Sequence, residues 1–82
     1  MTDTEKIARD LALMLIYLWS WEEGPFKARR CWKGFRFEVL DELAAAGLVS
    51  DSKRAKSLFL TAEGEQVARD LLSRYYGIEP ET

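Results

Sequence analysis

The first part of the chain carries its longest apolar pattern. No glycine or proline occurs before Gly24 and Pro25, so residues 3–23 are predicted to form one helix. Apolar side chains recur at three- and four-residue intervals and define one helix face, formed by Ile7, Leu11, Leu15 and Leu18 with Met14 and Trp21. Further large apolar residues fall outside this stripe and leave little polar surface after residue 10. A helix that is apolar nearly all round must be buried on more than one side.

A chain of 82 residues offers little other surface to cover such a helix. We therefore expect a homodimer through the first helix, because the same helix of a second subunit is the simplest cover. The interface is expected at the residues outside the stripe, namely Leu13, Ile16, Tyr17 and Trp19. The alternative is that the helix is the central core element of a single subunit.

The remaining pattern predicts two shorter helices and a hairpin. Residues 24–33 form a connection in which Cys31 and Trp32 make a short strand or a turn. Residues 36–46 have helical spacing and are followed by Gly47, a residue suited to the left-handed conformation at a helix end. Residues 48–60 contain two apolar runs around a polar turn, which indicates a β-hairpin.

The last helix is predicted over residues 61–76. Thr61 is its expected N-cap and Gly77 its expected end, and residues 78–82 are expected to be a flexible tail. The expected fold class is thus mainly α with a small β-hairpin (α+β), with three main helices and an antiparallel wing in a single domain over residues 1–77.

Two resemblances extend this picture. The run of Leu40 to Leu43, then Gly47 to Val49, then Leu58 to Gly64 resembles the second half of winged-helix transcription regulators, in which the recognition helix enters the wing. That resemblance covers residues 36–76 and implies a winged-helix-like fold. A full helix-turn-helix needs a further helix before the wing, and only residues 26–33 are available for it.

The second resemblance spans nearly the whole chain. A small bacterial family without a characterised function carries a similar pattern, which in this chain reads Trp32-Lys33-Gly34-Phe35, Leu40-Asp41, Gly47-Leu48, Lys53 to Ser57, Leu60-Thr61 and Glu63-Gly64. This resemblance supports the fold and implies no activity.

Charge is unevenly distributed along the chain. The net charge is −2, yet residues 27–56 hold eight basic against four acidic side chains. A basic loop and wing are expected to contact nucleic acid weakly, with Trp32 or Phe35 stacking on exposed bases. The candidate nucleic-acid-binding residues are Lys27, Arg29, Arg30, Lys33, Lys53, Arg54 and Lys56.

Other features oppose that hypothesis. The helix that would enter the major groove carries Glu38, Asp41 and Glu42, which would repel phosphates. The alternative is that the basic side chains are solvated or pair with acids of the first and last helices.

The chain lacks residues that several kinds of catalytic and binding site require. The chain has no histidine, and its five glycines stand singly, which excludes a Ser-His catalytic pair and a clustered phosphate-binding loop. No cofactor and no metal are expected, and we predict that the protein is not an enzyme. Cys31 lies among basic residues and is either a reactive thiol of lowered pKa or a small packed residue.

The longest apolar run, residues 11–21, is too short to cross a bilayer as a helix, and no secretory signal precedes it. We expect a cytoplasmic protein without membrane contact. The predicted function is that of a small non-enzymatic bacterial domain, regulatory in role, with weak nucleic-acid contact. The alternative function is a protein–protein interaction adaptor that reuses a winged-helix shape.

Overall fold

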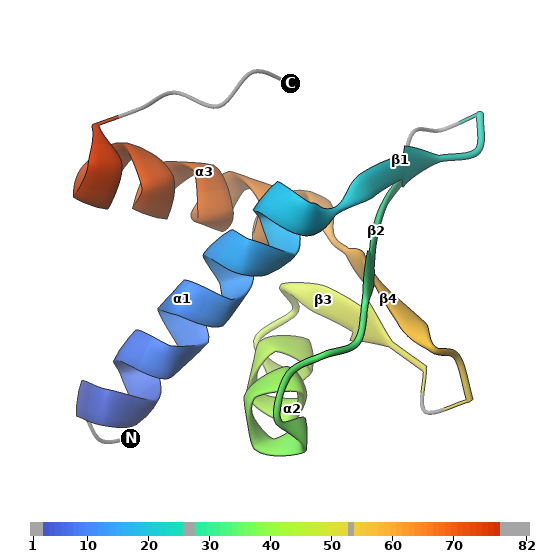
Figure 1. Cartoon of the computed structure of the whole chain (residues 1–82), viewed down its shortest axis with the longest axis horizontal. Helices are drawn as coiled ribbons and strands as arrows, with labels where there is room; N and C mark the ends of the chain where they lie inside the picture. Colours follow the sequence, from blue (N-terminus) through green and yellow to red (C-terminus); the bar gives the residue numbers. More distant parts are fainter. Residues whose placement is uncertain (1–2, 26–27, 53, 78–82) are drawn as a thin grey trace.

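The computed structural model describes residues 3–25, 28–52 and 54–77. It contains three helices and a four-stranded antiparallel sheet (Figure 1). The elements in chain order are α1 (Asp3–Trp19), β1 (Trp21–Glu23), β2 (Ala28–Trp32), α2 (Phe37–Ala45), β3 (Val49–Asp51), β4 (Ser57–Leu60) and α3 (Ala62–Tyr76). The predicted α+β class is confirmed.

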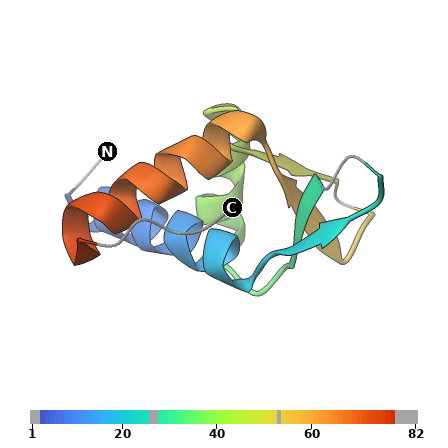
Figure 2. The ribbon, with the colours of Figure 1, turned by 90° about the horizontal axis from the view of Figure 1, so that it is seen from above.

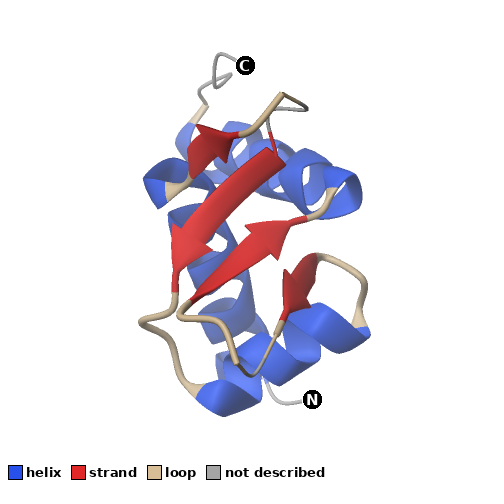
Figure 3. Ribbon diagram, turned by 90° about the vertical axis from the view of Figure 1, so that its right-hand side faces the viewer, coloured by secondary structure: helices blue, strands red, loops and turns tan. Residues whose placement is uncertain are grey.

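The strands lie in the order β1-β2-β4-β3, and every neighbouring pair is antiparallel. The three helices lie behind one face of this sheet, and its other face is turned to the viewer in Figure 3. Side chains alternate between these faces. The covered face carries the buried residues Cys31, Val49, Leu58 and Leu60.

The hydrophobic core lies between the covered face of the sheet and the helices. Helix α1 supplies its largest share, with Leu13, Met14, Ile16 and Tyr17 all buried. Helix α3 packs across α1, as Figure 2 shows from above, and adds Ala68, Leu71 and Leu72. Helix α2 adds Leu40 and Leu43.

Helix α3 begins as the sequence predicts. The Thr61 hydroxyl oxygen accepts a hydrogen bond from the Gly64 amide at 2.9 Å, and Gly77 ends the helix in the left-handed conformation with φ +65°. The Thr61 hydroxyl also lies 2.7 Å from the Gly47 carbonyl oxygen and 2.9 Å from that of Leu48, so it joins α3 to the segment after α2. The second helix, the hairpin and the last helix are all confirmed within one residue of their predicted bounds.

The first helix is shorter than predicted. It ends at Trp19 instead of residue 23, because residues 21–23 pair with residues 28–30 as strand β1. Ser20 marks the exit, since both its amide and its hydroxyl donate to the Tyr17 carbonyl oxygen. Of the two options for Cys31 and Trp32, the strand is correct.

The order of elements is compatible with a winged-helix-like arrangement in its second half, where α2 leads into the β3–β4 hairpin. Strand β2 occupies the place where a helix-turn-helix would need its first helix, so that motif is absent from the described residues. The predicted tail, residues 78–82, lies outside the described residues.

Candidate functional site

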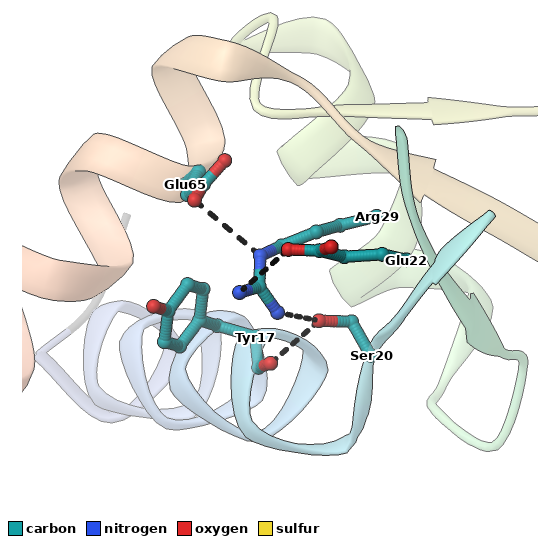
Figure 4. A network of polar contacts seen from close by, with 5 residues as sticks. All are labelled: Tyr17, Ser20, Glu22, Arg29 and Glu65. Carbon is teal, nitrogen blue, oxygen red and sulfur yellow. Dashed lines mark hydrogen bonds and ion pairs between the residues drawn. The ribbon is translucent and has the colours of Figure 1, made fainter. Parts of the chain in front are cut away.

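Arg29 is the centre of a polar network that joins four segments of the fold (Figure 4). Its Nε lies 3.3 Å from Glu65 Oε1 on α3, and its Nη2 lies 3.8 Å from Glu22 Oε1 on β1. Its Nη1 donates a 3.0 Å hydrogen bond to the Ser20 hydroxyl, and its guanidinium carbon lies 4.6 Å from the centre of the Tyr17 ring.

These contacts occupy the whole guanidinium, and the Arg29 side chain is only 14% exposed. A charge that is already paired and nearly buried has little capacity to bind a phosphate. The structure therefore places this candidate nucleic-acid residue in the scaffold, where it ties β2 to α1, β1 and α3.

Lys33 is also engaged within the chain. Its Nζ forms an ion pair with Asp51 and donates to the Ser52 carbonyl oxygen, and its side chain is 19% exposed. Lys33 therefore links the end of β2 to the β3–β4 turn. The alternative that basic residues pair with acids of the first and last helices holds for Arg29, which pairs with Glu65 on α3, whereas Lys33 pairs with Asp51 on β3.

The other candidate basic residues have different environments. Arg30 lies with its guanidinium carbon 4.5 Å from the centre of the Phe59 ring. Arg54 and Lys56 are exposed in the β3–β4 turn. Lys27 and Lys53 lie outside the described residues. Of the five candidate basic residues that the structure describes, Arg29 and Lys33 are thus engaged in ion pairs within the chain.

The acids of α2 are exposed or partly exposed, as expected for a solvated acidic face. Glu38 and Asp41 are exposed, and Glu42 is partly buried. Glu38 also lies 3.7 Å from Arg36 in an exposed ion pair. Helix α2 consequently presents negative charge where a recognition helix would meet DNA.

The predicted dimer interface is wrong for three of its four residues. Leu13, Ile16 and Tyr17 are buried inside the subunit's own core, and only Trp19 is exposed. Ile7, Leu11, Leu15 and Leu18 of the apolar stripe are exposed, whereas Met14 of the same stripe is buried. An all-round apolar helix has no polar side that would tell its two faces apart, so sheet and helix packing decide the matter.

The outer apolar surface of the molecule, which we name the α1–α3 face, consists of Ile7, Leu11, Leu15, Leu18, Tyr75 and Tyr76. These six side chains are between 36% and 63% exposed. They border two adjoining grooves of about 460 and 410 Å³, and both grooves are lined by Leu11, Met14 and Tyr76. Monomeric proteins rarely leave so large an apolar surface open without a function.

The outer face of the sheet holds a second unusual group, of which the sequence indicated Arg30 and Trp32. Cross-strand pairing aligns Trp21, Arg30, Phe59 and Ser50 in one row on this face, and Trp32 follows two residues after Arg30 on the same face. The two-residue alternation of residues 28–32 indicated part of this row. Strand β1 was missed because its residues were assigned to the predicted first helix.

Cys31 is buried and its thiol lies 3.4 Å from the Trp32 carbonyl oxygen. Burial raises the pKa of the Cys31 thiol, because a charged thiolate would lose its hydration there. Of the two expectations, this favours a packed residue and opposes a reactive thiol of lowered pKa. In the part of the chain that the structure describes, no cluster of three or more potential metal ligands occurs. No helix among those residues has the length and apolar character needed to span a bilayer.

Fold and surfaces together define a small α+β domain whose exposed chemistry lies on an apolar helix face and an aromatic sheet face. The chain belongs to the family described as a domain of unknown function (DUF6429), whose model matches residues 3–78. No curated protein and no solved structure matches the chain significantly.

Proposed function

We propose that this protein is a non-enzymatic interaction module that works as a homodimer, with the α1–α3 face as its subunit interface. The observation that carries the proposal is the uncharged outer arc of α1. At 100° per residue, Ile7, Leu11, Leu15 and Leu18 fall within one arc, which Thr4, Ala8 and Trp19 complete, and no charged residue lies in it. The opposite side of α1 packs in the hydrophobic core of the same subunit.

The size of the α1–α3 face suits a subunit interface. Its six side chains together expose the equivalent of about three full side chains, or roughly 600 Å² at ~200 Å² each. A symmetric pair would bury about twice that, at the lower end of the ~1,200–2,000 Å² typical of specific interfaces. Main chain and neighbouring side chains add to the buried area.

A second copy suits this face better than a charged partner does. A two-fold axis sets each surface against itself, so the exposed apolar side chains of one copy meet those of the other. Leu11 and Tyr76 line both grooves. A two-fold axis passing near these two residues would place the Leu11 side chain of each copy against a groove of the other copy. Charged partners would instead lose hydration without gaining an ion pair on this arc.

The proposal follows the adaptor alternative of the sequence analysis more closely than its nucleic-acid hypothesis. The hypothesis of nucleic-acid contact through a basic loop and wing loses support, because Arg29 and Lys33 form ion pairs within the chain. A regulatory role, the absence of enzymatic activity and a location in the bacterial cytoplasm stay predictions.

The dimer is tested by the mass of the native protein in solution. Sedimentation equilibrium at micromolar concentration should give twice the 9.5 kDa of one chain. Leu11→Glu combined with Leu18→Glu should give the single-chain mass with an unchanged far-UV spectrum, because both side chains are exposed and contribute little to the core.

The matched control is Phe37→Glu, which places the same charge at a strongly exposed apolar residue on α2. This variant should remain dimeric. A single-chain mass for the unmodified protein at ~100 µM would overturn the proposal, as would equal dissociation in the control.

A further inference from the structure

The outer face of the sheet presents three aromatic rings and a guanidinium on neighbouring strands. The ring centres of Trp21 on β1 and Trp32 on β2 are 5.1 Å apart, with 45° between the ring planes. One step along the same face, the Arg30 guanidinium covers the ring of Phe59 on β4 at 4.5 Å. The aromatic and cationic groups are therefore contiguous across β1, β2 and β4.

This group contributes little to the core. Trp32 is 63% exposed although it lies on a central strand, where its large ring could have been turned inward by a shift of one residue. Its neighbour Cys31 takes the buried position instead. An open indole on a sheet face is a surface suited to stacking with another flat π system.

We propose that this face, formed by Trp21, Arg30, Trp32 and Phe59, binds single-stranded nucleic acid. Bases stack on the exposed indole of Trp32 and on its aromatic neighbours. Base stacking on aromatic side chains contributes ~1–3 kcal/mol per base and tolerates any sequence, since every base has a flat face. The proposal is independent of the dimer, because the α1–α3 face is built from other elements.

Basic residues lie in the turn next to the end of this face that carries Trp32. The Lys33 amide donates to the Lys56 carbonyl oxygen at 3.1 Å, which places Lys56 beside the end of β2 that carries Trp32. Arg54 lies in the same turn, and both side chains are exposed. Arg54 and Lys56 are therefore the two cationic residues next to this end of the face that we expect to contact phosphates.

A single strand fits this face better than a duplex. In a duplex the base faces are stacked on each other and are not available to Trp32. A duplex bound by α2 would meet the exposed carboxylates of Glu38 and Asp41. A splayed single strand avoids both obstacles, because the flat sheet face needs only one strand and its bases.

The test uses the full chain and a fluorescein-labelled mixed-sequence DNA strand of 20 nucleotides, followed by fluorescence anisotropy. Two phosphate contacts predict that affinity falls about 7-fold between ~50 and ~200 mM salt. The complementary duplex should bind at least 10-fold more weakly than the single strand.

Trp32→Ala should weaken single-strand binding about 10-fold or more, and Trp32→Phe should retain most of it because a phenyl ring still stacks. The matched control is Phe37→Ala, since Phe37 is 77% exposed but lies on α2. The chain has three tryptophans, so in the Trp19→Ala variant all indole emission comes from Trp21 and Trp32. That emission should be quenched as the strand binds.

Several outcomes would overturn the proposal. No saturable binding at ~50 mM salt and 100 µM protein would do so, and the aromatic face would then be assigned to a protein partner. Equal loss of affinity in Phe37→Ala and Trp32→Ala, tighter binding of the duplex, or unquenched emission in a saturated complex would each exclude base stacking on this face.

Discussion

Gly64 shows how one missing side chain sets the position of a helix. It lies in the first turn of α3 with an ordinary helical backbone, so conformational freedom does not explain it. A Cβ built there would lie 1.9 Å from the Leu48 carbonyl oxygen and 2.9 Å from a Leu60 methyl carbon. The backbone after α2 approaches α3 this closely because Thr61 joins the two segments through its hydroxyl.

We predict that Gly64→Ala lowers the free energy of unfolding by about 3 kcal/mol or more, because the methyl group meets backbone that cannot move aside without breaking the Thr61 contacts. Urea denaturation measures the change. Gly34→Ala is the control, since no atom lies within 4 Å of its Cβ position and its φ is not positive. A Gly64→Ala variant as stable as Gly34→Ala would contradict the close approach.

At the scale of elements, α1 is held by two kinds of interaction. Its inner residues are packed in the core, and its C-terminal end is fastened by the Arg29 network through Tyr17 and Ser20. That network also reaches Glu65 on α3, 36 residues away in sequence. Arg29 therefore orients the two helices that form the α1–α3 face relative to the sheet.

Arg29→Met should lower the free energy of unfolding by about 1–3 kcal/mol, because it removes charge-assisted bonds and leaves Glu65 without its partner. Part of that loss is screened by solvent, since Glu22 and Glu65 are partly exposed. The control is Arg36→Met, whose arginine is 84% exposed and 3.7 Å from Glu38, with an expected change within ~0.5 kcal/mol. Urea denaturation of both variants at one salt concentration makes the comparison. Equal effects of the two variants would show that the network adds nothing beyond a surface ion pair.

At the scale of the whole molecule, the two proposed surfaces use different elements. The helices α1 and α3 provide an apolar face, and the strands β1, β2 and β4 provide an aromatic and cationic one. Dimerisation through the first would leave the second open on each subunit. A dimer would then present two stacking faces, which allows a longer strand to be held by both subunits.

A dimer also couples assembly to stability. We predict that the Tm of the native protein rises as protein concentration increases, because association stabilises the folded chain by mass action. Calorimetry at two concentrations 50-fold apart would detect this change. The Leu11→Glu, Leu18→Glu double variant should show a Tm that does not vary with concentration, and a concentration-independent Tm in the native protein would argue against the dimer.

The sequence by itself determined the elements whose signals are local. Helices α2 and α3 and the β3–β4 hairpin appear at their predicted places, because helical spacing, the Thr61 cap and the Gly77 end act within a few residues. For Cys31 the sequence left a reactive thiol and a packed residue open, and burial beneath the helices favours the packed residue.

Only the tertiary structure decided which face of α1 is covered, and it reversed the expected assignment of Leu13, Ile16 and Tyr17. Strand β1 likewise exists through pairing with β2, since its three residues match a continued helix equally well. The role of Arg29 depends on Glu65, 36 residues later. Each of these outcomes depends on contacts between segments that are distant in the sequence, and no local pattern encodes the energy of such contacts. The same contacts leave the two proposed surfaces on the outside of the molecule.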